Sequence, residues 1–315
     1  MAMSPDPGSA DLIAGARAGQ PRAIARLISR IENDAPDVPS IMRELSSTAG
    51  HAHVIGVTGS PGVGKSTSTS ALVTAYREQG KRVGVLAVDP SSPFSGGALL
   101  GDRVRMQAHA TDEGVFIRSM ASRGHLGGLA ATTPQVLRVL DAAGFDVTII
   151  ETVGVGQSEI EIAATADTSL VLLAPGLGDG IQAAKAGILE IGDIFVVNKA
   201  DRDGADSTVR EIRHMIDLGV RGGWQPPVLK TVASRHEGLT ELVAEIDRHR
   251  AWLDESGERE ARRLRRTQDE ISALVLGAVR QRLAADPEQL TNAAQSVLDG
   301  TTDSYSAAAN ILEQM

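Results

Sequence analysis

The chain has 315 residues, of which 42% are apolar and 23% charged, and its formal net charge is −9 at pH 7. Its length and apolar content predict a folded globular protein with a substantial core, and its negative charge argues against nucleic acid or an anionic membrane as a partner. The sequence contains no cysteine, which excludes disulfide bonds, thiolate metal ligands and a cysteine nucleophile.

Residues 1–50 are expected to form a helical extension at the amino terminus. The first residues, MAMSPDPGSADL, lack the basic start and apolar core of a signal peptide, and no apolar run in the chain approaches the roughly 20 residues of a membrane span. We therefore expect a soluble, cytoplasmic protein. Apolar residues after this start recur at helical spacing: Leu12, Ile24, Leu27, Ile28 and Ile31.

Residues 51–250 show a different pattern, in which short apolar runs rich in β-branched residues alternate with helical stretches. The runs are HVIGVTG, RVGVLAVD, VFIRSM, DVTIIET, TSLVLLA, DIFVVNK and PPVLKTV. Because they lack strict alternation, they are typical of strands buried on both faces of a parallel sheet. The sequence therefore predicts an α/β domain with a mainly parallel sheet flanked by helices.

Residues 251–315 are predicted to form a helical arm. Ile271, Val275, Val279 and Leu283 recur every four residues in a long amphipathic helix, and a last short helix is expected around Tyr305. The arm also carries a basic cluster, which we interpret as a solvated, salt-bridged helix face because acidic residues flank it at helical distances. The cluster consists of Arg262, Arg263, Arg265 and Arg266.

The stretch GVTGSPGVGKST follows the first predicted strand directly and has the pattern of a phosphate-binding loop. Backbone N–H groups of such a loop converge on a phosphate, and the following helix presents its positive dipole end to the same anion. Lys65 would add charge at the β- and γ-phosphates, and Ser66 would bind Mg²⁺. The domain is therefore predicted to be a P-loop NTPase, with these nucleotide-binding candidates: Gly59, Ser60, Pro61, Gly62, Val63, Gly64, Lys65, Ser66 and Thr67.

The tetrapeptide NKAD ends the sixth predicted strand, where a loop at the carboxyl edge of the sheet would reach a nucleotide base. The carboxylate of Asp201 can accept hydrogen bonds from guanine N1–H and from its amino group, a pattern that adenine does not offer. Asn198 and Lys199 complete the motif, so GTP or GDP is the expected ligand. Ala233 and Ser234 form a second base loop, from which we expect a backbone contact.

Acidic residues follow two other predicted strands. Asp89 ends one strand and Glu151 lies near the end of another, so both can hold Mg²⁺ beside a triphosphate, together with Ser66. Asp102 is a further metal candidate, although it can equally cap or solvate a helix. Gly154 would offer its amide to the γ-phosphate.

The expected chemistry is transfer of the γ-phosphoryl group to water. The candidate catalytic residues are Lys65, Glu151 and Gln157. The water-orienting glutamine of small GTPases directly follows the glycine of this loop, but here Val155 occupies that place and Gln157 comes two residues later. Hydrolysis by the isolated protein is therefore expected to be slow.

Together these residues resemble the methylmalonyl-CoA mutase-associated GTPase chaperones, the MeaB/ArgK-type branch of the P-loop GTPases. The resemblance covers nearly the whole chain, and several matching strings are long and unusual. They are GSPGVGKST, VDPSSPFSGGALLGDRVRM, RGHLGGLA, ETVGVGQSE, APGLGDGIQAAKAGI and NKAD.

The resemblance implies a GTPase that uses GTP and Mg²⁺ and associates with methylmalonyl-CoA mutase. Such a protein gates the loading of adenosylcobalamin into the mutase and helps to replace inactivated cofactor, with no cobalamin site of its own. A homodimer joined through the carboxyl-terminal arm is also implied, with neither nucleic acid nor membrane as a partner.

The resemblance also assigns three switch segments. Asp89 and Asp102 fall in the first, residues 151–159 form the second, and residues 174–188 form a third that responds to the partner. Lys185 in this third switch is a candidate for a catalytic charge delivered when the mutase docks, although a solvated helix lysine is an equal alternative. Relatives generally carry Asp-Glu where this chain has Asp179 and Gly180.

Two other functions remain open on the sequence. An ATP-dependent kinase of the transport-kinase label would prefer ATP, which NKAD argues against. A GTPase metallochaperone of the nickel type would carry a cysteine or histidine cluster, and the sequence has no cysteine and no histidine-rich tract.

Overall fold

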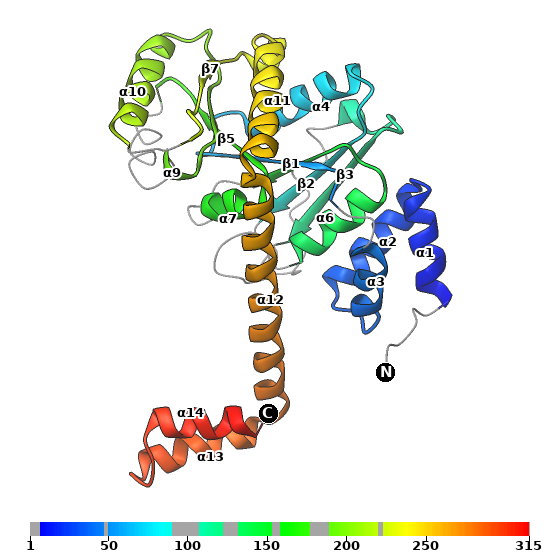
Figure 1. Ribbon diagram of the computed structural model, residues 1–315, viewed down its shortest axis with the longest axis vertical. Coiled ribbons are helices and arrows are strands. Elements are labelled where there is room, and N and C mark those ends of the chain that lie inside the picture. The colour runs from blue at the N-terminus through cyan, green and yellow to red at the C-terminus, as the bar shows by residue number, and fades with distance from the viewer. Residues whose placement is uncertain are drawn as a thin grey trace. The chain divides into compact units, whose positions relative to one another are not determined.

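The computed structural model describes residues 7–46, 50–89, 107–121, 132–152, 158–176, 189–219 and 223–314 (Figure 1). By compactness the chain divides into two units, Met1–Arg262 and Arg263–Met315. The division falls inside one long helix, α12 (Glu258–Ala285).

The first unit is built on a sheet in which seven strands are described, and each neighbouring pair of strands is parallel. Across the sheet the order is β3-β2-β4-β1-β5-β6-β7. Every strand coincides with one of the seven predicted apolar runs, so the α/β prediction is confirmed. The strands are β1 (His53–Gly59), β2 (Val83–Asp89), β3 (Val115–Ala121), β4 (Val147–Thr152), β5 (Thr168–Leu173), β6 (Ile194–Val197) and β7 (Val228–Lys230).

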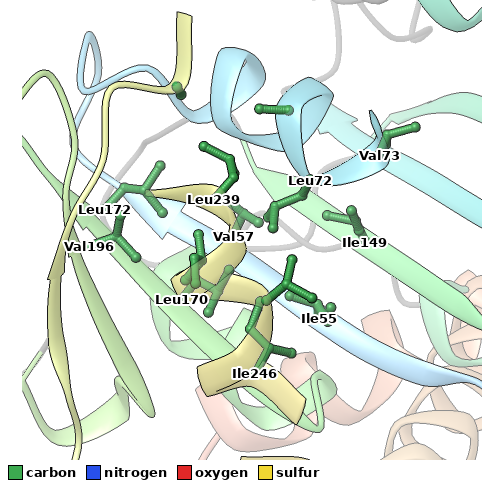
Figure 2. Packing of buried hydrophobic residues seen from close by; sticks show 14 of the residues in the cluster. Ile55, Val57, Leu72, Val73, Ile149, Leu170, Leu172, Val196, Leu239 and Ile246 are labelled. Carbon is green, nitrogen blue, oxygen red and sulfur yellow. The ribbon is translucent and has the colours of Figure 1, made fainter. Parts of the chain in front are cut away.

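Successive residues of these strands enter cores on opposite faces of the sheet. Leu170 and Leu172 of β5 join a core with helices α4 (Lys65–Glu78) and α11 (Leu239–Ser256). Figure 2 shows both leucines beside Leu239 of α11. Val171 packs instead with α10 (Ala205–Leu218) on the other face. Apolar side chains on both faces explain why the runs lack strict alternation.

The second face is covered in three stretches. Helix α7 (Ser158–Thr165) contacts β1, β4 and β5, and α10 contacts β6 and β7. Helix α6 (Thr133–Ala142) packs beneath the amino-terminal helices, which share a core with it and with Leu86 and Met120 of the sheet. These helices are α1 (Pro7–Arg17), α2 (Pro21–Glu32) and α3 (Val38–Leu45). The shorter elements are η2 (Gln107–His109), α9 (Leu189–Ile191) and η4 (Ala233–Arg235).

The second unit contains the rest of α12 with α13 (Pro287–Leu298) and α14 (Ser304–Glu313), which pack on each other. Asp286 and Asp303 cap these two helices, since their carboxylates accept hydrogen bonds from backbone N–H groups of the first turn. The predicted helical character of the arm is confirmed. Across the described ranges, we find no helix with the length and apolar character that crossing a membrane would require.

Candidate nucleotide-binding site

The predicted ligand loops meet at the carboxyl edge of the sheet. Because the strands are parallel, the loops after β1, β6 and β7 leave from this same edge, where β4 also ends. The phosphate loop (59–67), the NKAD loop (198–201) and the base loop (231–235) are joined by hydrogen bonds. The structure therefore brings together three segments that lie far apart in the sequence.

The phosphate loop needs glycine at two positions for different reasons. Gly59 has φ +138°, and a Cβ there would collide with the backbone carbonyl oxygen of Leu172. Gly64 has φ +97°, and a Cβ there would lie 2.5 Å from Nδ2 of Asn198. Positive φ is costly for any residue with a Cβ, and both positions also lack the space for one. The glycines thus allow neighbouring strands and loops to approach closely.

Lys65 is the first residue of α4, and its side chain folds back over the loop. Its Nζ donates hydrogen bonds to the carbonyl oxygens of Gly59 at 2.7 Å and Ser60 at 3.2 Å. The residue is only 8% exposed. The ammonium group is therefore held over the loop at the start of the helix, where the dipole favours an anion.

Ser66 and Glu151 meet at the end of β4. The hydroxyl of Ser66 donates to Oε1 of Glu151 at 2.6 Å, and Glu151 is only 2% exposed. Asp89 ends the neighbouring strand β2, where its backbone pairs with Ala121 of β3. Two of the four predicted metal ligands are thus in contact.

Asn198 links all three loops through its side-chain amide. Its Nδ2 donates to the carbonyl oxygen of Val63 at 2.9 Å, and its Oδ1 accepts from Thr231 Oγ1 at 3.2 Å and from the backbone N–H of Ala233 at 3.1 Å. The residue is 3% exposed. An amide carries both donors and acceptors, which is why a single asparagine can hold a carbonyl oxygen and an N–H group together.

The rest of the NKAD loop is arranged around this link. Lys199 has φ +56°, and its Nζ donates to the carbonyl oxygen of Gly62 at 2.5 Å. Ala200 donates its N–H to the carbonyl oxygen of Thr231 at 3.0 Å. Asp201 is exposed, and its Oδ2 lies 3.3 Å from Nη2 of Arg235 in the base loop. The predicted base reader therefore has a cationic neighbour that no motif in the sequence indicated.

Several candidates fall outside the described residues, namely Asp102, Gly154, Gln157 and Lys185. For Asp89, only the backbone is described. Over the ranges that the structure covers, no group of three or more histidine and carboxylate side chains could hold a metal ion.

One expectation about the arm is wrong. Arg262 was assigned to a solvated helix face, but its guanidinium binds both carboxylate oxygens of Asp193, at 2.9 and 3.0 Å. The pairing expected along the helix is present, since Arg262 Nε lies 3.7 Å from Oε1 of Glu258, but Arg262 is not solvated because its main partner Asp193 lies just before β6. Asp193 is 7% exposed, so this ion pair belongs to the core at the amino edge of the sheet.

Comparison with known proteins agrees with this geometry. Residues 24–288 match the family model described as methylmalonyl-CoA mutase-associated GTPase MeaB. A protein of Pyrococcus horikoshii named as a GTPase is 46% identical over 309 residues, which are 97% of this chain and 98% of that protein. GTPase ArgK of Escherichia coli is 37% identical over 258 residues, 79% of this chain and 78% of that protein.

A solved structure is also similar over its whole length. It is described as a LAO/AO transport system kinase, it covers 99% of each chain with a TM-score of 0.73, and it is 26% identical. The fold, the phosphate loop and the matching family model agree with one another. The chain therefore belongs to the MeaB family of methylmalonyl-CoA mutase-associated GTPases.

Proposed function

We propose that this GTPase binds GTP at the carboxyl edge of its sheet and uses the bound nucleotide to regulate a cobalamin-dependent acyl-CoA mutase. The observation that carries the proposal is the hydrogen-bonded link from the phosphate loop through Asn198 to the base loop. This link supports the proposal because it holds the two loops expected to bind the triphosphate and the base at a fixed separation. It thereby joins the general phosphate chemistry of the first loop to the guanine preference expected of Asp201.

In this proposal the phosphate groups lie over residues 59–67. Lys65 has three N–H donors, and its ammonium group donates to two loop carbonyl oxygens at the start of α4. A phosphate oxygen would compete for these donors and would also accept from the loop N–H groups. Gly154 would offer a further N–H to the γ-phosphate.

The residues present fit Mg²⁺. This ion prefers hard oxygen ligands, and the Ser66 hydroxyl and the Glu151 carboxylate are oxygen donors that lie 2.6 Å apart. Asp89 and Asp102 would complete the set directly or through water. When bound, the ion would neutralise charge that develops on the transferred phosphoryl group.

The reaction is transfer of the γ-phosphoryl group to water. Lys65 would stabilise negative charge on the phosphoryl oxygens, and Glu151 would fix the Ser66 hydroxyl at the site. Gln157 and Lys185 are proposed to complete the catalytic set, Gln157 at the attacking water and Lys185 on docking of the partner. Slow hydrolysis by the isolated protein follows from this division of roles.

For the base, we propose that Asp201 accepts from N1–H and the amino group of guanine. The backbone of Ala233 and Ser234 would flank the same ring. Lys199 would cover the base with its stem, since its Nζ already spans to the carbonyl oxygen of Gly62.

The proposed partner is methylmalonyl-CoA mutase, whose adenosylcobalamin loading the chain would gate. The family description carries this assignment. A homodimer through the arm is proposed as well, because α12 exposes a run of large apolar side chains that a second copy would cover. These are Leu264, Ile271, Leu274, Val275 and Leu276, each more than half exposed. Sedimentation of the full chain would measure this association.

The proposal is tested by GTP hydrolysis with the purified chain, in the presence and absence of methylmalonyl-CoA mutase from the same source. We expect slow turnover of GTP that rises on addition of the mutase. Lys65→Ala is the control for the chain's own activity, because loss of the loop ammonium should abolish tight nucleotide binding. A hydrolysis rate that does not change on addition of the mutase would refute the proposed partner. Preferential turnover of ATP would favour a kinase.

A further inference from the structure

We infer that Arg235 is a positioning residue for guanine recognition, which acts by holding the carboxylate of Asp201 in the orientation that the base requires. The inference rests on the proposed role of Asp201 as base reader. Its starting observation is the ion pair between Arg235 Nη2 and Asp201 Oδ2, at 3.3 Å. Arg235 lies in a different loop from Asp201, so the pair connects the two loops expected around the base.

The backbone of Arg235 is well fixed. Its N–H donates to the carbonyl oxygen of Val232 at 2.9 Å, and Val232 in turn pairs with Glu237 across an antiparallel bridge. Ala233, two residues before Arg235, is buried in the core beside α4, with 3% exposure. Hydrogen bonds therefore close this turn, and buried Ala233 anchors it in the core. The side chain of Arg235 projects from the turn.

Asp201 is fixed from the same side. Its neighbour Ala200 donates an N–H to Thr231, and Thr231 donates its hydroxyl to Asn198. Asp201 and Arg235 thus belong to two loops whose backbones are hydrogen-bonded to each other. What remains free to rotate is the side chain of Asp201, and the guanidinium of Arg235 restricts that rotation.

The pairing leaves room for the base. A carboxylate offers about four lone-pair positions on its two oxygens. Arg235 occupies a position on Oδ2, and the two guanine N–H groups need one position on each oxygen. The ion pair and the two guanine hydrogen bonds can therefore coexist, so Arg235 need not leave when the nucleotide arrives.

Restricting the carboxylate beforehand favours binding, because a side chain that is already ordered loses less entropy when the ligand binds. A planar guanidinium fixes the plane of a carboxylate better than an ammonium does, since its N–H groups point in set directions. We therefore expect Arg235→Lys to retain the local charge but to lose part of the orientation.

The experiment compares the affinities of GDP and IDP by calorimetry in wild type, Arg235→Ala and Arg235→Lys. Hypoxanthine lacks the 2-amino group of guanine, so the ratio of the two affinities reports the second hydrogen bond to Asp201. We expect Arg235→Ala to lower this ratio by roughly threefold to tenfold, a range set by the ordering of one side chain. Arg235→Lys should lie between wild type and Arg235→Ala. Arg202→Ala, which removes the same charge from the exposed residue after Asp201, should leave the ratio unchanged.

A general loosening of the loop would weaken GDP and IDP equally, and an unchanged ratio would overturn the inference. Tighter GDP binding in Arg235→Ala would overturn it too, because Arg235 would then compete with the base. The effect of Arg235→Ala on the ratio should disappear in an Asp201→Asn background.

Asp201→Asn also separates this inference from the proposed function. The asparagine amide can donate where the carboxylate only accepts, so Asp201→Asn should shift the preference toward XDP. If that shift occurs while Arg235→Ala leaves the ratio unchanged, the inference alone fails. If the wild type shows no preference for guanine and Asp201→Asn causes no shift, the base reader itself is wrong.

Discussion

The two edges of the sheet carry polar groups that differ in how far they are buried. At the carboxyl edge, Asn198 after β6 is buried, whereas Asp201 in the same loop and Arg235 in the loop after β7 are exposed. At the amino edge, His53 of β1 and Thr168 of β5 are 1% and 0% exposed. The sheet thus supports an open set of charges at one edge and a closed set at the other.

The closed set is a chain of contacts through the core. The hydroxyl of Thr168 lies 2.8 Å from Nε2 of His53 and 2.8 Å from Nδ1 of His249 on α11. His249 Nε2 lies 3.4 Å from Oδ1 of Asp193, which Arg262 of α12 binds through both carboxylate oxygens. The amino edge is therefore tied to the two helices that follow the sheet in sequence.

Aromatic rings enclose this network. The ring of His249 lies 4.7 Å from that of Trp224 and 5.7 Å from that of Trp252, between ring centroids. Trp224 also donates its indole N–H to the carbonyl oxygen of Asp193 at 2.7 Å. Water is kept away, so each polar contact here is stronger than it would be at the surface and its loss is more costly.

This difference explains the separate roles that we assign to the two edges. Exposed charges can change partners when a ligand arrives, because water solvates them in the meantime. Water does not replace the partner of a buried charge, so buried ion pairs stabilise one arrangement of the chain. We therefore expect changes at the amino edge to alter stability and changes at the carboxyl edge to alter nucleotide affinity.

The largest effect is expected from Asp193→Asn. Burial alone would raise the pKa of the Asp193 carboxyl, but its interactions with His249 and Arg262 outweigh burial and lower the pKa to about 2. Asp193→Asn removes the carboxylate that pairs with Arg262, and the Arg262 guanidinium lies in a mostly buried position. We expect the free energy of unfolding to fall by about 3–5 kcal/mol, measured by urea denaturation.

The control for Asp193→Asn is Asp206→Asn, which removes one partner of the exposed pair between Asp206 and Lys230. These side chains are 75% and 52% exposed, respectively. Here the free energy of unfolding should change little, because water solvates both side chains. If the two substitutions lower the free energy of unfolding equally, burial does not strengthen the ion pair at the amino edge. The contrast between the two edges would then be wrong. GDP affinity well below the unfolding temperature should be unchanged in both variants.

A smaller effect is expected from pH through His53. Burial lowers the pKa of His53 from 6.5 to about 3, because the charged imidazole would lose its water. In the unfolded chain the imidazole takes up a proton below 6.5, whereas in the folded chain it stays neutral down to about 3. The stabilisation by neutral His53 is therefore complete above 6.5 and is lost as the pH falls toward 3.

Within this window, His53 should contribute a slope of about 1.4 kcal/mol per pH unit to the free energy of unfolding. His53→Gln should remove this contribution, as measured by urea denaturation from about pH 7 to about pH 4. Asp193 does not contribute in most of this range, since its pKa lies between 3.8 unfolded and about 2 folded. His214→Gln, at an exposed position on α10, is the matched control and should leave the slope unchanged. An equal slope in His53→Gln and wild type would contradict the assignment.

The two edges also differ in how well the sequence predicted them. The phosphate loop and NKAD are contiguous motifs whose spacing reports their chemistry, and the structure brings both to one edge. The strands were predictable for a similar reason, since each is a short local run. Only the extent of a strand was less certain, as in PPVLKTV, of which Val228–Lys230 forms β7.

The amino-edge network had no such signal. His53 and Thr168 are 115 residues apart, Thr168 and His249 are 81 apart, and Arg262 and Asp193 are 69 apart. Each is a single polar residue that belongs to no recognisable motif. They come together only because α11 packs on the sheet and Arg262, near the start of α12, binds Asp193. Arg235 was missed for a related reason, because its partner Asp201 belongs to another loop.

The smallest expected effect is a difference in GDP affinity between alanine variants of two glycines in the phosphate loop. This prediction tests the carboxyl edge alone. Gly62 and Gly64 both have positive φ, at +81° and +97°, but a Cβ at position 62 meets nothing within 4 Å whereas one at position 64 lies 2.5 Å from Nδ2 of Asn198. Gly62→Ala therefore measures backbone strain, about 1 kcal/mol. Gly64→Ala adds displacement of the amide that holds the Val63 carbonyl oxygen.

We expect GDP to bind Gly64→Ala about tenfold more weakly than Gly62→Ala in calorimetry, because the link between the phosphate and base loops is disturbed only in the first. Equal affinities would mean that Asn198 does not set the distance between the two loops. The free energy of unfolding should differ less between these two variants than between Asp193→Asn and Asp206→Asn, since a neutral amide rather than a buried charge is disturbed. A large difference in unfolding would show instead that the carboxyl edge stabilises the fold as the amino edge does, and the contrast between the two ends of the strands would fail.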